Sequence, residues 1–273
     1  MSWLNRPASR TQITHLQRLW LYVFGVATLI ALVAPTFIVV PMSFSPSDFL
    51  EFPPSGFSLR WYENYLGSPD WMRASFVSLR AAILTMLCAT AIGTAAAYGL
   101  FVSSFRGRTL LYALFAMPIT VPIIILAVGS LFVLARLSLV NTTVGLVGMH
   151  TALALPLVII IVTAGLASYD FNQEQVARSL GATRTYAFFS VTLPQIKFSV
   201  ISSMLFSFFA SFDEVVVAMF ISNGTAATLN RRMFNALRDS VDPTISAIST
   251  CLIGVSLILV LLGQIFSERR KMN

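Results

Sequence analysis

Two adjacent acidic residues lie inside a long apolar stretch of the chain. Asp213 and Glu214 follow Phe212 and precede three valines, in a stretch from 195 to 222 that is otherwise rich in Phe, Val, Ala and Ser. A carboxylate among apolar groups binds a cation or pairs with a basic side chain, because an isolated charge is costly there. We therefore treat Asp213 and Glu214 as candidate residues of a path for a cationic solute.

Arg80 is the arginine that lies well inside another apolar stretch, from 74 to 102. If both stretches cross a membrane as helices that rise about 1.5 Å per residue, Arg80 and the two acids lie at similar depths. Two interpretations stay open. At least one acid lines a solute path, or Arg80 forms an ion pair with Asp213 or Glu214 that holds two helices together.

The composition indicates which elements position these charges. The chain has 273 residues, of which 56% are hydrophobic and 11% are charged, whereas about a quarter are charged in soluble domains. A stretch of about 20 apolar residues crosses the hydrocarbon of a bilayer as a helix. The sequence therefore excludes an ordinary soluble protein and predicts one all-α, polytopic membrane domain over residues 1–273. The six predicted spans lie near 20–42, 74–102, 109–135, 143–168, 195–222 and 244–267.

The net charge is +7, which would favour nucleic-acid binding in a soluble chain. Here the basic residues lie mainly in connectors between the predicted spans, and such residues concentrate on the cytoplasmic side of a membrane. We therefore expect no nucleic-acid partner, and we predict that both termini are cytoplasmic. The residues predicted inside are Arg6, Arg10, Arg18, Arg106, Arg108, Arg178, Arg184, Lys197, Arg269, Arg270 and Lys271.

Other sites for chemistry are sparse in this sequence. Cys88 and Cys251 fall in predicted spans, where they act as small apolar side chains, so neither a disulfide nor a metal site is predicted. The chain has no phosphate-binding glycine loop, so it is not expected to bind ATP itself. His15 and His150 are too few and too far apart in sequence to suggest an intramembrane enzyme.

Three prolines in the predicted third and fourth spans remove backbone hydrogen bonds and are expected to bend their helices. They are Pro118, Pro122 and Pro156. A bent helix can take part in opening a path, and simple packing is the alternative. In the second span, Gly93 and the alanines after it let neighbouring helices approach closely.

The loop from about 223 to 243 alternates apolar and basic positions at helical spacing, and it predicts an amphipathic helix at the outer surface. It is an exception to the charge rule, because it carries three arginines on the predicted outer side. Contact with a solute-binding protein and cover for the mouth of a path remain open as its roles. Its apolar positions are Leu229, Met233, Phe234 and Leu237, and its basic positions are Arg231, Arg232 and Arg238.

Residues 169–194, here named the coupling segment, form a polar connector between the predicted fourth and fifth spans. Gly181 stands where a short helix would end in a left-handed cap, and Thr183 offers a hydroxyl that can begin a second helix. Val176 and Leu180 lie one turn apart on the first helix. This pattern predicts a small apolar face that a partner protein can bind. The other residues of this predicted face are Ala187, Phe188 and Val191, on the second helix. The charged residues beside the face are Glu174, Arg178 and Arg184.

The coupling segment resembles the EAA loop of ABC-importer permeases, in which an acidic-Ala-Ala run precedes Leu-Gly-Ala and then Leu-Pro. Here residues 174–177 read Glu-Gln-Val-Ala, followed by Leu-Gly-Ala at 180–182 and Leu-Pro at 193–194. Gln175 and Val176 depart from the pattern, and an ordinary connector with a glycine cap is the alternative. The resemblance implies docking on an ATPase, a role that it assigns to Glu174, Ala177, Gly181 and Arg184.

The run from Ser211 to Val217, together with the coupling segment, resembles permeases of spermidine/putrescine-type ABC importers. The resemblance covers nearly the whole chain and implies a type I importer fold in a bacterial inner membrane, without enzymatic activity. It implies a second permease subunit in a heterodimer, two cytoplasmic ATPase subunits, and a periplasmic or surface-anchored solute-binding protein. It also implies no cofactor in this chain, with ATP and Mg bound by the ATPase.

Two alternative functions stay open at this point. An ABC permease for another small solute, such as an iron, thiamine or phosphonate compound, would share this architecture, because selectivity rests largely on the binding protein. An ion-coupled secondary transporter would bind a proton at Asp213 or Glu214 and would need no ATPase.

Overall fold

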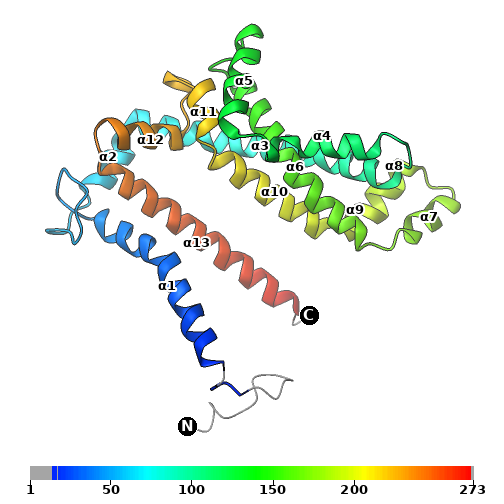
Figure 1. Cartoon of the computed structure of the whole chain (residues 1–273), viewed down its shortest axis with the longest axis horizontal. Helices are drawn as coiled ribbons and strands as arrows, with labels where there is room; N and C mark the ends of the chain where they lie inside the picture. The colour runs from blue at the N-terminus through cyan, green and yellow to red at the C-terminus, as the bar shows by residue number, and fades with distance from the viewer. Residues whose placement is uncertain (1–13, 17, 272–273) are drawn as a thin grey trace. The chain divides into compact units, whose positions relative to one another are not determined.

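The computed structural model describes the backbone of residues 14–16 and 18–271, with side chains as far as Ile258. The regular elements of this described part are helices, which confirms the predicted all-α fold (Figure 1). The predicted cytoplasmic charges near the two ends belong partly to residues whose side chains lie outside the described part. These residues are Arg6, Arg10, Arg269, Arg270 and Lys271.

The chain divides into two compact units. The first contains Met1–Ser68 and Ala236–Asn273, and the second contains Pro69–Asn235. Helix α12 (Leu229–Asp239) contributes residues to both units. The single permease domain expected from the sequence stays a prediction.

The first unit is built from α1 (Leu19–Met42), α2 (Arg60–Gly67) and α13 (Thr244–Lys271). Helices α1 and α2 both pack on α13. Asn64 of α2 donates a hydrogen bond to Oγ1 of Thr244 at 2.8 Å, and this bond fixes α2 at the beginning of α13.

The connector between α1 and α2 is organised around a half-buried carboxylate. The hydroxyls of Ser55 and Ser45 donate to Oε1 of Glu51 at 2.6 and 2.7 Å. The hydrogen bonds from Ser55 and Ser45 hold the pKa of Glu51 below its usual value of 4.5. Asp48 and Arg60 form an exposed ion pair at 2.9 Å in the same connector.

Helices α3 (Pro69–Val102), α6 (Thr143–Ala167) and α10 (Lys197–Phe212) pack on one another in the second unit. A carbon added at Gly93 of α3 would lie 2.6 Å from Cγ1 of Val158 in α6. Because no side chain fits at that position, the small residue is required for the close contact of the two helices. The packing role expected for this part of the chain is confirmed.

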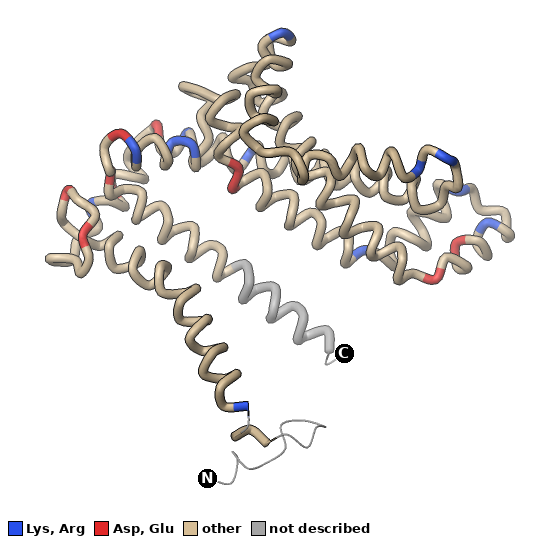
Figure 2. The backbone as a smooth tube through the Cα atoms, viewed as in Figure 1, with Lys and Arg blue, Asp and Glu red and all other residues tan. Residues whose placement is uncertain are grey.

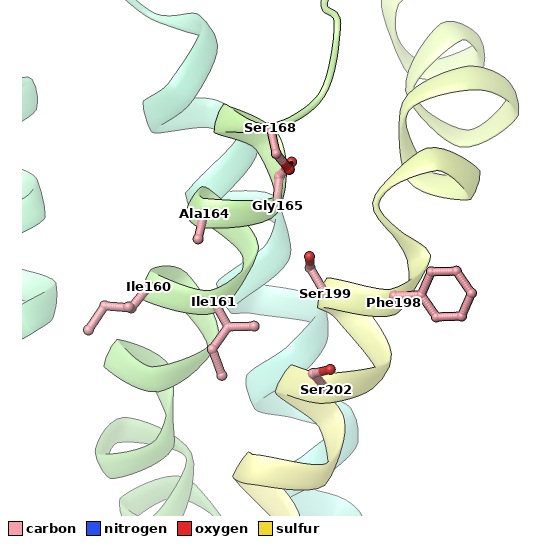
Figure 3. Close-up of a pocket in the computed structure, with 8 residues that line it drawn as sticks. All are labelled: Ile160, Ile161, Ala164, Gly165, Ser168, Phe198, Ser199 and Ser202. Atoms are coloured by element: carbon pink, nitrogen blue, oxygen red, sulfur yellow. Dashed lines mark hydrogen bonds between the residues drawn. The ribbon is translucent and has the colours of Figure 1, made fainter. Parts of the chain in front are cut away.

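Helices α6 and α10 also approach each other closely. A carbon added at Gly165 of α6 would collide with Oγ of Ser199 in α10. Figure 3 shows Ser199 lying between the two helices beside Gly165. A groove of about 470 Å³ opens next to this contact, and its lining includes Ile160, Ala164 and Ser202. The small side chains at the contact therefore set the distance between α6 and α10.

The predicted third span, 109–135, is not one helix. It consists of α4 (Arg108–Thr120) and α5 (Ile123–Arg136), which meet at an angle of 104°. Val121 adopts an extended conformation with ψ 135°, because the ring of Pro122 disfavours a helical conformation in the residue before it. The expected bend is therefore a complete break at Pro122.

The predicted fifth span, 195–222, is also interrupted, and the expectation of one continuous helix is wrong. Helix α10 ends at Phe212, and α11 (Val216–Ile221) begins after three intervening residues. At its other end, the pieces Arg184–Gln195 and Lys197–Phe212 meet at 79°. The two acids expected inside a helix therefore lie at a break between α10 and α11.

Helices α1, α3 and α6 are long and apolar enough to cross a membrane. If each of the two bent pairs is counted as one span, the described residues contain up to five such segments. Helix α6 runs through Pro156 without interruption. Helix α13 is apolar over its described portion, Thr244–Ile258. In Figure 2, most of the blue (Lys, Arg) and red (Asp, Glu) positions lie in connectors and near helix ends. This distribution agrees with a chain whose long helices lie in a membrane.

The predicted amphipathic helix is confirmed as α12. In the second unit its first residue is anchored on α3, because the amide of Leu229 donates to Oγ of Ser78 at 2.8 Å. Arg232 pairs with Asp70 at 3.0 Å, and its guanidinium carbon lies 5.0 Å from the ring centre of Trp71. These contacts fix the beginning of α12 against the beginning of α3.

Candidate functional site

The coupling segment begins with helix α7 (Asn172–Ser179), which ends as its sequence predicts. Gly181 has φ +95°, a left-handed conformation that glycine adopts without strain. The amide of Ala182 donates to the carbonyl of Ala177, and the amide of Gly181 donates to that of Arg178. This pair of bonds closes a helix end around a left-handed residue. The predicted glycine cap is confirmed.

A second helical piece follows after Thr183. The hydroxyl of Thr183 accepts a hydrogen bond from the amide of Tyr186 at 3.3 Å, which confirms the predicted N-cap. The piece consists of α8 (Arg184–Ala187), a π-helical turn (Phe188–Thr192) and α9 (Leu193–Gln195). The coupling segment is thus a preformed pair of helical pieces.

Four large apolar side chains of the coupling segment are exposed. Val176 and Leu180 are 59% and 84% exposed, and Tyr186 and Phe189 are 67% and 61% exposed. We name these four residues the apolar face. Contiguous apolar surface on a polar element marks a contact site for another molecule. The predicted exposure of Val176 and Leu180 is confirmed.

The second piece contributes to this face through Tyr186 and Phe189, and the expected contribution of Ala187, Phe188 and Val191 is wrong. Ala187 is buried, and Phe188 and Val191 are half-buried. The ring of Phe188 packs on that of Tyr98 in α3, with ring centres 4.5 Å apart. The second piece therefore turns these side chains toward the core of its own unit.

Glu174 is fully buried, although it belongs to a polar helix. The hydroxyl of Tyr98 donates to Oε1 of Glu174 at 2.6 Å, and the hydroxyl of Thr192 donates to Oε2. The sequence analysis placed Glu174 beside the exposed face, and that placement is wrong. Its carboxylate turns inward because the two hydroxyls satisfy both of its oxygens away from solvent.

The other two candidate coupling residues flank this buried carboxylate. The guanidinium carbon of Arg184 lies 5.9 Å from the ring centre of Tyr98, a geometry typical of a cation–π contact. Arg184 is exposed, and Ala177 is half-buried. Of the four candidates, Gly181 and Arg184 are therefore the ones that lie at the surface, together with the apolar face.

Glu214 occupies the break between α10 and α11 and is 8% exposed. Its carboxylate accepts hydrogen bonds from the amide of Val217 at 3.0 and 3.1 Å and from that of Ala218 at 3.3 Å. It therefore satisfies amides that α11 leaves free at its N-terminus and places a negative charge there. This local cap is a physical reason for the interruption of the helix.

Asp213 has a different environment from its neighbour. It is the C-cap residue of α10, and its side chain is exposed. Its Oδ1 accepts a long hydrogen bond of 3.4 Å from Asn230, whose Nδ2 also donates to the carbonyl of Phe212 at 3.0 Å. The carboxylate of Asp213 is thus accessible at the break, whereas that of Glu214 is occupied by the backbone.

Of the two interpretations left open for Arg80 and the two acids, the ion pair does not form among the described residues. Its Nη2 donates to Oγ1 of Thr143 at 2.7 Å, and the ion pairs of the described residues join Arg80 to neither acid. The reason is that Glu214 is already satisfied by amides of α11 and that Arg80 finds a hydroxyl at the start of α6. The guanidinium is exposed on the second unit.

Sequence reasoning missed Tyr98, Thr192 and Asn230. Tyr98 lies near the end of a span, where a tyrosine is ordinarily interpreted as an interface anchor. Thr192 directly precedes the Leu-Pro pair, and no spacing connects it with Glu174. The partners of Glu174 lie 76 and 18 residues away in sequence, so pattern and periodicity give no signal for them.

The fold and the site together define a class of protein. Apolar helices, a preformed polar segment with an apolar face, and an accessible carboxylate at a helix break are features of a membrane transport subunit. Residues 89–271 match the family model of the inner membrane component of binding-protein-dependent transport systems. The chain belongs to this family, and it is a non-enzymatic permease subunit of an ABC importer.

The relatives of the chain include permeases with named substrates. The spermidine/putrescine transport system permease protein PotC of Haemophilus influenzae is 30% identical over 238 residues, which cover 86% of this chain and 91% of that protein. The putrescine transport system permease protein PotI of Escherichia coli K12 is 31% identical over 230 residues, 82% of each chain. The predicted resemblance to this group is confirmed.

A solved structure shares the fold. It is the crystal structure of a bacterial ABC transporter involved in the import of the acidic polysaccharide alginate. One of its chains matches with a TM-score of 0.72 at 15% identity, and the match covers 92% of this chain and 98% of that one. The likeness confirms the predicted architecture of an importer permease.

Proposed function

We propose that this permease carries a polyamine such as spermidine or putrescine. Its relatives with polyamines in their names are 30% and 31% identical over most of the chain. Polyamines are cations, and a carboxylate in an apolar environment attracts cations strongly. The exposed carboxylate of Asp213, at the break between α10 and α11, is the observation that carries this assignment.

In this proposal the two acids at the break have unequal roles. Asp213 contacts the ammonium groups of the solute along the path. Glu214 holds the first turn of α11 through Val217 and Ala218, and so keeps the break open.

The proposed assembly contains this chain and a second permease subunit, which together form a heterodimer. Both termini and the coupling segment face the cytoplasm, where two ATPase subunits bind ATP and Mg²⁺. A solute-binding protein delivers the solute on the outer side. The apolar face of the coupling segment supports this arrangement, because it supplies the surface that an ATPase cleft can enclose.

ATP-driven closure of the ATPase then moves the coupling segment and shifts the permease between two conformations. The break at Pro122 and the bend before α10 divide long apolar segments into shorter pieces that can rotate separately. The chain itself supplies no group for ATP hydrolysis in this mechanism.

The two alternative functions fare differently. An ion-coupled secondary transporter is not favoured, because the chain belongs to a family of binding-protein-dependent systems. A permease for an iron, thiamine or phosphonate compound would keep the same fold and partners. Asp213 disfavours the anionic phosphonate, and the names of the relatives are the ground on which we prefer a polyamine to an iron or thiamine compound.

The test is ATP hydrolysis by the purified complex in liposomes, with its ATPase and binding protein. Spermidine and putrescine are compared with phosphonate and thiamine. The coupling variant is Gly181→Asp, and its matched control is Gly224→Asp, because Gly224 is also left-handed at φ +55° with open space around it. Both substitutions introduce the same side chain and similar backbone strain.

We expect a polyamine to stimulate hydrolysis, Gly181→Asp to abolish the stimulation, and Gly224→Asp to retain it. If only another solute stimulates the native complex, the polyamine assignment is wrong. If no ATPase copurifies with the chain, the proposed assembly is wrong. Equal loss in both glycine variants would show that strain, and not docking, explains the effect.

A further inference from the structure

The buried carboxylate of Glu174 joins helix α7 to helix α3 through side chains. Tyr98 belongs to α3 and donates to one carboxylate oxygen at 2.6 Å, while Thr192 donates to the other from the end of the π-helical turn. Tyr98 and Glu174 are separated by 76 positions in sequence. The carboxylate therefore brings three separate elements to one point.

We call the carboxylate of Glu174 and its two hydroxyl donors, Tyr98 and Thr192, the joint. Its hydrogen bonds are polar and directional. A hydrogen bond to an ionised carboxylate is about twice as strong as one between neutral groups. Because Glu174 is 0% exposed, water does not replace a lost donor at that position. Helix α7 therefore cannot move away from α3 without leaving a buried charge with one donor fewer.

The surrounding contacts confine this joint. The ring of Tyr98 contacts both the ring of Phe188 and the guanidinium of Arg184. Phe171, just before α7, contacts Phe101 of α3 with ring centres 6.1 Å apart. These ring contacts are apolar or diffuse and tolerate sliding, so the hydroxyl of Tyr98 is the group that fixes the position of α7 on α3.

Helix α7 is connected along the chain to α6 before it and to α10 after it, but not to α3. Helix α3 has 34 residues, a length of about 50 Å. We propose that Glu174 is a positioning residue that transmits movement of α7 to α3 through Tyr98 and Thr192. In this role it does not itself contact the ATPase. The inference rests on the proposed function and specifies how the coupling segment acts on the membrane helices.

The experiment separates transmission within this chain from contact with a partner. Three variants are compared in the full complex: Glu174→Gln, Tyr98→Phe and Thr192→Val. Tyr98→Phe keeps the ring that Phe188 and Arg184 contact, and it removes only the hydroxyl. The matched control is Tyr112→Phe, which removes a hydroxyl from α4 and leaves Glu174 unchanged.

Two quantities are measured. The first is the amount of radiolabelled putrescine taken up per ATP hydrolysed. The second is amide hydrogen exchange of residues 172–180 in the purified permease without its ATPase, which reports whether the joint holds α7 in place. The exchange measurement tests the joint whatever the transported solute is.

We expect Tyr98→Phe and Thr192→Val to lower uptake per ATP about tenfold, and to accelerate exchange in α7 about tenfold, as the loss of one hydrogen bond to a charge predicts. A further variant, Glu174→Ala, leaves no acceptor for the hydroxyl of Tyr98, so the double variant Glu174→Ala/Tyr98→Phe should be no worse than Glu174→Ala alone. Tyr112→Phe should match the native protein.

The inference is overturned if Tyr98→Phe and Thr192→Val match the native protein in both measurements while Glu174→Gln loses coupling. That result would place Glu174 in contact with the ATPase. It is also overturned if the effects of Glu174→Ala and Tyr98→Phe add. A native complex without ATP-driven uptake would overturn the proposed function and the transmission role together, even where exchange shows that the joint exists.

Discussion

Glu174 and Glu214 are buried carboxylates in the same compact unit, yet their partners come from different distances along the chain. Glu214 accepts hydrogen bonds from amides three and four residues away. Glu174 accepts them from hydroxyls 76 and 18 residues away. A local cap forms together with its own helix, whereas the joint at Glu174 exists only when α3 and the coupling segment are assembled. Loss of the Glu214 carboxylate should therefore destabilise only the beginning of α11, whereas loss of the Glu174 carboxylate should also affect α3 and the rest of the coupling segment.

Glu51 provides a third case, because it has hydroxyl partners like Glu174 but is only half-buried, whereas Glu174 is 0% exposed. Its donors, Ser45 and Ser55, are six and four residues away. Water replaces a missing partner there at little cost. Burial and sequence distance together therefore rank the expected effects of removing each carboxylate.

The largest effect is expected from Glu174→Ala, which leaves the hydroxyls of Tyr98 and Thr192 without their acceptor. Each lost hydrogen bond to a buried charge is worth about 1.5–3 kcal/mol, so the free energy of unfolding should fall by about 3 kcal/mol. Denaturant titration of the purified permease in micelles measures this change. A loss below about 1 kcal/mol would show that the joint does not stabilise the fold.

Glu214→Ala should cost about 1–2 kcal/mol, since it removes the side-chain acceptor of the first turn of α11. The added substitution Val215→Ser should restore about half of the loss, because Val215 occupies the N-cap position and a serine hydroxyl can accept from the same amides. The same titration gives both values. Absence of any rescue would contradict the assignment of Glu214 as a cap.

Asp213→Asn should leave the free energy of unfolding within about 0.5 kcal/mol, because the side chain is exposed. Uptake of putrescine should nevertheless fall about tenfold, as the charge that attracts the cation is lost. Asp239→Asn, on the exposed surface of α12, is the control and should not alter uptake. Equal uptake by the native protein and Asp213→Asn would remove Asp213 from the path.

The smallest effect concerns the pH dependence of the connector around Glu51. Hydrogen bonds from Ser55 and Ser45 hold its pKa below 4.5 in the folded chain. They therefore stabilise the connector above pH 4.5, and this contribution is lost as the pH falls through the lowered pKa. NMR titration of the carboxyl carbon should show the low pKa, and Ser55→Ala should raise it toward 4.5. A native pKa at or above 4.5 would refute the hydrogen-bond pattern.

Local features of the fold could be predicted from the sequence because they depend on neighbouring residues. The glycine cap at Gly181 and the hydroxyl cap at Thr183 follow from backbone conformation and from free amides within three residues. The apolar stretches follow from the cost of exposing polar groups to lipid. The amphipathic helix α12 follows from periodicity alone.

The errors of the sequence analysis concern interactions between distant residues and competition between nearby ones. Burial of Glu174 depends on Tyr98, which no spacing relates to it. A similar depth left an ion pair of Arg80 with an acid open as one interpretation, but depth does not determine which direction a side chain faces. The break at Asp213 and Glu214 depends on a local cap that competes with a continuous helix, and apolar periodicity alone favours the helix.

The sequence by itself determined that this chain is a helical membrane permease with a polar coupling segment, because hydropathy and turn chemistry act over a few residues. Tertiary structure alone decided that Glu174 faces inward to α3, that Arg80 binds Thr143, and that α4 and α5 meet at 104°. The reason is that the direction of a side chain or a helix is set by the partners that satisfy its polar and apolar groups, and those partners come together only when the chain folds.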